Sequence, residues 1–394
     1  MTRDAQNEHT LSVRERDRRY SSIRERLREN GVDCAIVNGS NLFYLSNGIA
    51  GELYGLLPAA DIPLTVVVNR RHLIDISPSV LLDSQEWVSD VRPGSDAAAV
   101  VERIKELGLD EATIGLAGSL DYRFHNRLKA ASLSAAKVVD VSDIFTDVRT
   151  IKSDAENAMI DQANRIFDSA IRRIHEVARP GMSGRKVVEE GIGAMWEAGG
   201  DLESTLSFNF GPVPAQNPIL ADLCMTRKIE KGDIGTLTAH SMFGGYAGHS
   251  DQEICFGEPK PVHQEMFRAV TSIRDAVLAQ VKDGATQRDL IDAYRKACKE
   301  TGFKSSPHSQ IHQYGIDVPE FPGPGYRIPD PKPEVGGLGG AGNYVLKSGM
   351  IYSISPTVVN NEGSDTLLGG TSLVVTENGY RNHGERKVEM LVVA

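Results

Sequence analysis

The stretch that decides the fold is Lys231–Gly257, KGDIGTLTAHSMFGGYAGHSDQEICFG. Its sequence predicts a β-hairpin, with one strand over GDIGTLTAH and a second over YAGHSDQEICFG. The turn between them is expected at Phe243-Gly244-Gly245, because glycine tolerates the positive φ angles that tight hairpin turns need. The hairpin is therefore the frame on which the polar residues of this stretch are placed.

The polar side chains of this hairpin are expected to gather on one face. Because side chains alternate along a strand, His249, Asp251 and Glu253 share a face of the second strand. Thr238 and His240 share a face of the first strand by the same rule. Imidazoles beside carboxyls can move protons near neutral pH. The alternative interpretation is that these groups only hydrogen-bond one another to order a half-buried face.

Length and composition narrow the class of protein. The 394 residues are enough for two or three domains with a sizeable core, and the formal net charge of -10 argues against a nucleic-acid partner. The polar start lacks the apolar core of a signal peptide, and no apolar run is long enough to cross a bilayer. Four cysteines without CxxC spacing indicate reduced thiols. These features predict a cytoplasmic protein with no membrane and no nucleic-acid partner.

Helices and strands alternate through the N-terminal part of the chain, which predicts an α/β layer. The expected helices cover 12–30, 96–107 and 121–131, and the expected strands cover 32–37, 62–68, 71–76, 113–117 and 137–140. In the segment RTIKSDAE, Ser153 and Glu156 have the spacing of a capping box that opens a long helix. We place the domain boundary there, with an N-terminal domain over 1–150 and a C-terminal domain over 151–394.

The C-terminal part predicts paired helices between strands, an α+β pattern. The expected helices cover 154–178, 183–198, 261–282 and 286–302, and a strand is expected over 205–210. The segment Phe321–Leu338 is crowded with proline and glycine, so it is expected to be neither a helix nor a central strand. Two interpretations of it stay open, a loop over a functional site and a disordered surface excursion. The sequence does not decide whether the loop 321–343 closes over a site.

The hairpin and three later segments together resemble the pita-bread family, which includes methionine aminopeptidase, aminopeptidase P and creatinase. The three segments are His312–Glu320, Ser348–Pro356 and Gly370–Gly379. The RTIKS junction also resembles the place where this family passes into its catalytic domain. The resemblance implies a creatinase-like α/β N-terminal domain followed by an α+β pita-bread domain.

The resemblance also bears on metal binding. In the metallopeptidases of this family, two aspartates of the hairpin, one histidine and two glutamates bind a metal pair. The matching positions in this chain hold Thr238, His249, His312, Ser355 and Gly370. A hydroxyl and an imidazole do not replace bridging carboxylates around hard divalent cations, and one remaining histidine falls short of the roughly three ligands that a stable site needs. The sequence therefore predicts a site without metal or any other cofactor.

Creatinase is the natural comparison, because it uses this fold without metal to hydrolyse a small guanidino compound. Asp251 matches a creatinase carboxylate that contacts substrate, and His312 matches an active-site histidine. Gln216 stands where creatinase has its catalytic histidine, and a glutamine cannot act as a base. The resemblance thus implies a creatinase-like site whose base comes from another residue. The candidates for that base are His249, His240 and His308.

The resemblance and the hairpin pattern together assign the site residues. The expected catalytic residues are His312, Asp251 and His249. The expected substrate-binding residues are Gln216, His240, His308, Glu253, Glu320, Ser355 and Tyr54. For Tyr54 the simpler interpretation is packing, and for Glu320 it is a solvated loop acid.

The same resemblance implies a homodimer, because in creatinase-like dimers the N-terminal domain of one subunit leans over the site of the other. The apolar and aromatic stretch Leu42–Leu57, which a monomer is expected to leave partly exposed, supports the same interpretation.

The favoured function is a metal-independent hydrolase of a small polar non-peptide substrate, with C–N bond cleavage by His/Asp general acid–base chemistry. One alternative is a lyase, in which the same site removes a proton and no water attacks. Another is a non-catalytic binding module descended from a peptidase. The clustered protonatable groups favour an enzyme. The sequence names neither the substrate nor the histidine that acts as base.

Overall fold

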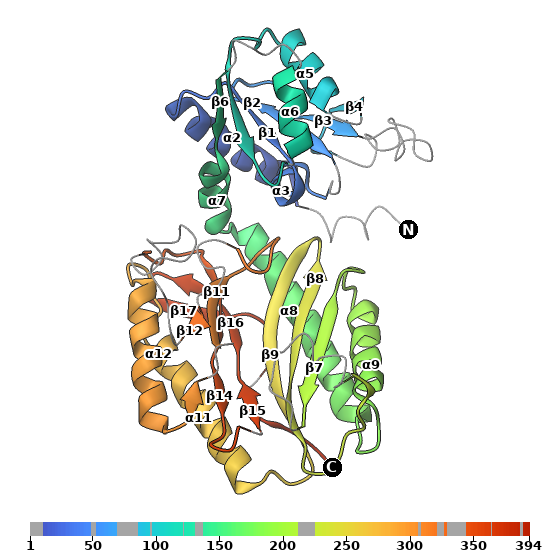
Figure 1. Cartoon of the computed structure of the whole chain (residues 1–394), viewed down its shortest axis with the longest axis vertical. Helices are drawn as coiled ribbons and strands as arrows, with labels where there is room; N and C mark the ends of the chain where they lie inside the picture. Colours follow the sequence, from blue (N-terminus) through green and yellow to red (C-terminus); the bar gives the residue numbers. More distant parts are fainter. Residues whose placement is uncertain are drawn as a thin grey trace. The chain divides into compact units, whose positions relative to one another are not determined.

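The computed structural model describes most of the chain. The described residues are 11–48, 53–68, 86–94, 97–120, 122–130, 137–211, 225–305, 309–320, 327–328, 344–363, 365–386 and 389–394. Contacts divide the chain into two compact units, Met1–Arg149 and Thr150–Ala394, both drawn in Figure 1. Among the described helices, none combines the length and the apolar composition that crossing a bilayer requires.

The N-terminal unit is built on a mixed six-stranded sheet with the order β4-β3-β2-β1-β5-β6. Its strands are β1 (Cys34–Val37), β2 (Tyr54–Pro58), β3 (Thr65–Val68), β4 (Asp90–Pro93), β5 (Thr113–Ala117) and β6 (Lys137–Asp140). Its described helices are α2 (Val13–Glu29), α3 (Gly39–Ser46), α5 (Ala97–Glu106), α6 (Tyr122–Ala130) and α7 (Ser142–Thr150). Ile36, Val67 and Ile114 of the sheet join Ile104 and Phe124 of the helices in one buried cluster. The α/β layer expected from the sequence is confirmed.

Four elements of this unit, α3, β2, β4 and α7, lie outside the sequence-based expectations, and the strand expected at 71–76 lies outside the described residues. The helix α3 and the strand β2 bury Leu42, Leu45, Leu56 and Leu57 completely within the unit. Phe43 and Tyr54 of the same stretch are only half-buried, so its described residues leave part of their aromatic surface exposed. The homodimer stays a prediction that rests on the family resemblance.

The C-terminal unit begins with the predicted capping box. The Ser153 hydroxyl accepts a hydrogen bond from Glu156 N at 3.2 Å, and the Glu156 carboxylate accepts one from Ser153 N at 2.9 Å. This box opens α8 (Asp154–Val177), and further helices are α9 (Gly184–Glu197), α11 (Pro261–Leu278) and α12 (Gln287–Thr301). The helix α11 ends at Leu278, before the expected 282, because the chain goes over to i→i−3 turn bonds there, from Gln280 N to Val277 O and from Val281 N to Leu278 O.

Three sheets complete this unit, and Figure 1 shows the two larger ones side by side between the helices. The four-stranded sheet has the order β18-β9-β8-β7, with β18 (Leu391–Val393), β9 (Tyr246–Phe256), β8 (Ile234–Phe243) and β7 (Thr205–Phe210). The five-stranded sheet has the order β12-β11-β13-β16-β17, with β12 (Arg327–Ile328), β11 (Ser309–Gln313), β13 (Ile351–Ser355), β16 (Thr371–Thr376) and β17 (Gly379–Asn382). A small sheet joins β10 (Lys304–Ser305), β14 (Thr357–Val359) and β15 (Thr366–Leu368). The helix α8 packs on β8 and β9, and α11 packs on β13, β14 and β15.

The predicted central hairpin is present as β8 and β9. Its turn is Gly244-Gly245, with φ angles of 56° and 74°, so both turn residues need the left-handed backbone that glycine adopts without strain. Phe243, which the sequence analysis places in the turn, instead pairs with Tyr246 as the last step of the ladder. The register pairs His240 with His249 and Thr238 with Asp251. The polar side chains of the two strands therefore lie opposite one another.

Candidate active site

The polar face of the hairpin meets side chains from the five-stranded sheet. His249, Asp251 and Glu253 on β9 are all buried, with exposed fractions of 7%, 3% and 4%. Across from them, His312 lies on β11 and Ser355 on β13, also buried. The site is thus formed where the two larger sheets of the C-terminal unit face each other.

Asp251 is held by hydroxyls from both sheets. Its carboxylate accepts a hydrogen bond from Thr238 Oγ1 at 2.6 Å and another from Ser355 Oγ at 2.8 Å. Ser353 Oγ lies 3.1 Å from Ser355 Oγ, which extends the chain of hydroxyls along β13. Burial raises the pKa of Asp251 to about 6, although the two hydroxyls and the positive charge of Arg386 favour the ionised form. Asp251 can therefore change its charge near neutral pH.

Three imidazoles, from β8, β9 and β11, pack against one another. The ring centroid of His249 lies 4.6 Å from that of His240 and 5.0 Å from that of His312. His249 Nδ1 lies 3.2 Å from the Ala239 carbonyl oxygen, and His312 Nδ1 lies 3.0 Å from the Gln313 carbonyl oxygen. A carbonyl oxygen can only accept, so in both rings Nδ1 carries the proton and Nε2 keeps its lone pair.

These imidazoles are neutral at pH 7. Burial lowers the pKa of His312 to about 4, and burial also lowers the pKa of His240. For His249, burial together with the neighbouring imidazoles holds the pKa well below its ordinary value. A neutral imidazole with a free Nε2 can accept a proton from water or from a substrate. The cluster therefore offers proton acceptors in a low-dielectric site.

Glu253 lies one step further along the same face of β9. Its Oε1 has no hydrogen-bond partner among the described residues. Burial raises the pKa of Glu253 to about 7, so this carboxyl also titrates near neutrality. Glu253 is thus a second buried carboxyl with a free oxygen. Side-chain alternation along β9 places it on the same face as Asp251.

Two glycines leave the room that these carboxyls occupy. A Cβ atom at Gly370 would lie 1.9 Å from Asp251 Oδ2 and 2.6 Å from Ser355 Oγ. A Cβ atom at Gly369 would lie 2.2 Å from Glu253 Oε1. Carbon atoms do not approach oxygen this closely without displacement. Gly369 and Gly370 are therefore required for the present positions of both carboxyls.

The residues of this site do not fit the metal pair that the fold family implies. The hydroxyls of Thr238 and Ser355 are both donated to Asp251, and Gly370 has no side chain to act as a ligand. Within the described ranges, no three His, Cys, Asp or Glu side chains come together in an arrangement that could hold a metal ion. Hard divalent cations need several oxygen ligands, which this arrangement does not supply.

The other residues assigned from the sequence are spread over the molecule. Gln216 and His308 lie outside the described residues. Tyr54 belongs to the N-terminal unit, where its ring stacks on Phe124 with the centroids 4.3 Å apart. Glu320 is not a solvated acid, because it forms a buried ion pair with Lys152 at 2.7 Å. The predicted contacts of Tyr54 and Glu320 with substrate stay predictions.

Arg386 is the site neighbour that the sequence analysis does not identify. Its Nη1 donates a hydrogen bond to the main-chain oxygen of Asp251 at 2.7 Å. The residue lies in the segment NHGERKVEM near the end of the chain, where no periodicity or motif marks it. Long-range contacts of this kind depend on how the chain returns to the sheet, which local sequence patterns do not report.

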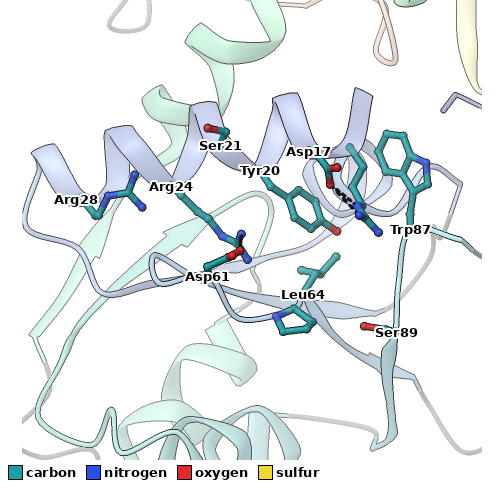
Figure 2. A pocket seen from close by; sticks show the side chains of 11 residues that line it. Asp17, Tyr20, Ser21, Arg24, Arg28, Asp61, Leu64, Trp87 and Ser89 are labelled. Carbon is teal, nitrogen blue, oxygen red and sulfur yellow. Dashed lines mark hydrogen bonds and ion pairs between the residues drawn. The ribbon is translucent and has the colours of Figure 1, made fainter. Parts of the chain in front are cut away.

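A cavity of about 730 Å³ lies in the N-terminal unit, apart from these residues. It is lined by Arg16, Asp17, Tyr20, Ser21, Arg24, Arg28, Asp61, Pro63, Leu64, Trp87 and Ser89. Figure 2 shows Arg24 reaching Asp61, and the two form an ion pair of 2.7 Å. Arg16 is paired with Asp17 in the same way, at 2.8 Å. Because these arginines are already paired within the protein, the cavity does not present an unpaired cationic cluster.

The close fit around Gly370 gives a test of the site's packing. Gly370→Ala should lower the free energy of unfolding by about 1–3 kcal/mol, because the added methyl displaces Asp251 from its two hydroxyl partners. Urea unfolding of the purified protein measures this change. The matched control is Gly193→Ala on α9, where an added Cβ meets nothing within 4 Å. A Gly370→Ala protein as stable as wild type would contradict the packing described here.

Comparison with known proteins agrees with the two-unit architecture. Residues 19–151 match the creatinase/prolidase N-terminal domain, and residues 158–383 match metallopeptidase family M24. The Xaa-Pro dipeptidase of Pyrococcus furiosus is 24% identical over 300 residues, which cover 74% of this chain and 78% of that protein. The creatinase of Bacillus sp. strain B-0618 is 24% identical over 395 residues, covering 95% of this chain and 91% of that protein.

Solved structures show the same fold. The Xaa-Pro dipeptidase from Bacillus anthracis superposes with a TM-score of 0.79 at 21% identity, covering 96% of this chain and all of that one. The prolidase from Pyrococcus horikoshii OT3 gives a TM-score of 0.76 at 20% identity, covering 95% of this chain and 99% of that one. The predicted fold, a creatinase-like N-terminal domain followed by a pita-bread domain, is confirmed. The chain belongs to metallopeptidase family M24, a family of hydrolases, and carries the creatinase/prolidase N-terminal domain.

Proposed function

We propose that this protein is a cytoplasmic, metal-independent hydrolase that cleaves a C–N bond in a small polar non-peptide substrate. The observation that carries the proposal is the buried pair of neutral imidazoles, His249 against His312, on a strand face that also carries the ionisable carboxyl of Asp251. Such a set supplies both a proton acceptor and a fixed negative charge, which are the parts that general acid–base hydrolysis needs. The donor set at the family's metal positions supports a reaction that uses no metal.

The roles follow from the hydrogen bonds of each group. His312 Nε2 takes a proton from water, and the resulting hydroxide attacks the carbon of the C–N bond. Asp251, oriented by the Thr238 and Ser355 hydroxyls, holds a polar or cationic nitrogen of the substrate in place. The C–N bond then breaks, and the protonated imidazole returns its proton to the leaving nitrogen. His249 shields the site from solvent and offers a second acceptor within 5.0 Å of the His312 ring centroid.

A second candidate is hydrolysis of dipeptides, which the relatives named Xaa-Pro dipeptidase favour. That activity would also cleave a C–N bond, so the two candidates differ in substrate rather than in bond type. A single substrate screen distinguishes the two candidates. It contains Xaa-Pro dipeptides, with and without added Mn²⁺, beside small amino, amide and guanidino compounds. Turnover of a dipeptide only in the presence of the metal would establish the second candidate and contradict the first.

The catalytic assignment is tested by two substitutions, measured on a compound turned over in that screen. His312→Ala and Asp251→Asn should each lower kcat by a factor of about 10²–10⁴ while the circular dichroism spectrum is kept. Because burial raises the pKa of Asp251 to about 6, the wild-type rate should fall as the pH drops through about 6, where the carboxylate becomes protonated. That limb should be absent from Asp251→Asn.

The matched control for this experiment is His175→Ala, which removes an exposed histidine of α8 in the same unit. It should leave kcat unchanged. Wild-type kcat in both His312→Ala and Asp251→Asn would end the acid–base mechanism assigned to these residues.

We further propose that the protein works as a homodimer, as its match to the creatinase/prolidase N-terminal domain and family M24 suggests. The proposed cytoplasmic location is supported by three buried free thiols, Cys34, Cys255 and Cys298. Thiols are kept reduced in the cytoplasm, whereas disulfides form and persist in oxidising compartments. Light scattering at low micromolar concentration should give about twice the 42.8 kDa mass of the chain. A mass near that of one chain would refute the dimer.

A further inference from the structure

The segment that follows β17 runs back along the outer side of β9. Gln252 Nε2 donates a hydrogen bond to the Glu389 carbonyl oxygen at 2.8 Å. Further on, β18 pairs in parallel with β9, placing Leu391 beside Ile254. Among the described residues, the part of β9 at Ser250 and Asp251 has no strand on this side, since the ladder with β18 begins only at Ile254.

Arg386 occupies the place of that missing strand. Its Nη1 donates to the Asp251 main-chain oxygen at 2.7 Å, and its Nη2 donates to the Ser250 hydroxyl. Its Nε donates to Asp168 Oδ1 at 2.6 Å. The guanidinium also lies over the ring of Phe167, 4.5 Å from the centroid. All three donor groups of one side chain are therefore used, two of them on the strand that carries the site.

Asp168 fixes this guanidinium from α8. Its side chain is almost fully buried, and its second oxygen accepts a hydrogen bond from Glu385 N at 2.9 Å. The planar guanidinium can engage a carboxylate and main-chain oxygens at once, which a lysine cannot do in the same geometry. The pair thus joins the core helix α8 to β9 at the residue that bears the central carboxylate.

We propose that Arg386, held by Asp168, is a positioning residue that fixes β9 at Asp251 and sets the electric field on its carboxylate from behind the strand. Arg386 does not touch a substrate, and its effect reaches the site through Asp251. This inference deepens the proposed function, because it concerns the same site. It is tested below through the proton on Asp251 itself, so it can fail or hold whether or not the proposed hydrolysis is found.

The charged and titratable groups around Asp251 come from several elements. On β9 they are His249 and Glu253, on β8 His240, on β11 His312, on α8 Asp168, and on the C-terminal segment Arg386. The imidazoles are neutral at pH 7, so they contribute little field there. Arg386 favours the ionised forms of both Asp251 and Glu253, and Asp168 opposes it with a negative charge. Substitutions can therefore remove the charge of Arg386 or that of Asp168 separately.

The experiment is a carboxyl ¹³C NMR titration of the full chain labelled at aspartate Cγ, with Asp251 assigned from the signal lost in Asp251→Asn. Arg386→Gln removes the positive charge, so the proton affinity of Asp251 should rise by about threefold or more. Asp168→Asn keeps Arg386 and removes its counter-charge, so the proton affinity should fall by a similar factor. The double variant should lie between the two.

The matched control is Arg381→Gln, which removes an exposed arginine of β17 that pairs with Asp161 at 3.5 Å. It should leave the Asp251 titration unchanged. If Arg386 and Asp168 had only a structural role, either substitution would disorder β9, and both would shift the proton affinity of Asp251 in the same direction. That result overturns the proposal. Unchanged titration in both variants overturns it as well. If Arg386→Gln does not fold, Asp168→Asn alone decides, because only a field effect lowers the proton affinity.

Discussion

The antiparallel pairing of β8 with β9 is the constraint on which the rest of the site depends. Its register places His240 opposite His249 and Thr238 opposite Asp251, so these four polar side chains lie on one face of the hairpin. A slip of one residue would turn this face toward α8 and the core. The Gly244-Gly245 turn prevents that slip, because a two-residue turn with both φ angles positive allows one pairing of the flanking strands.

The surrounding residues are matched to this face by size as well as by polarity. Gly370 provides the space for the Asp251 carboxylate, and the small Ser355 and Thr238 supply hydroxyls at hydrogen-bond distance. Larger carboxylate side chains at these positions would compete with Asp251 for the same volume. At the positions where the resemblance places metal ligands, Thr238, Ser355 and Gly370 accommodate and orient one carboxylate.

Much of this could be predicted from the sequence because its signals are local. Alternation along Lys231–Gly257 predicts the shared face, and Ser153 with Glu156 predicts the start of α8. The complete burial of Leu42, Leu45, Leu56 and Leu57 could not be predicted, because α3 and β2 bury these side chains only once the sheet has formed. The contact of Arg386 with Asp251 joins residues 135 apart in the chain, and the pairing of Lys152 with Glu320 spans 168. Neither contact is marked by a pattern in the local sequence, because its two residues are so far apart along the chain.

The central claim is that neutral imidazoles, proposed to bind no metal, lie on the same strand face as an ionisable Asp251. Histidine ¹⁵N NMR of the purified protein at pH 7, recorded before and after treatment with a chelator, tests it most directly. We expect His249 and His312, assigned by substitution, to show a protonated Nδ1 and an unprotonated Nε2, with spectra that the chelator leaves unchanged. Imidazolium signals at pH 7, or ring nitrogen signals that shift when the chelator removes a bound metal, would contradict the account.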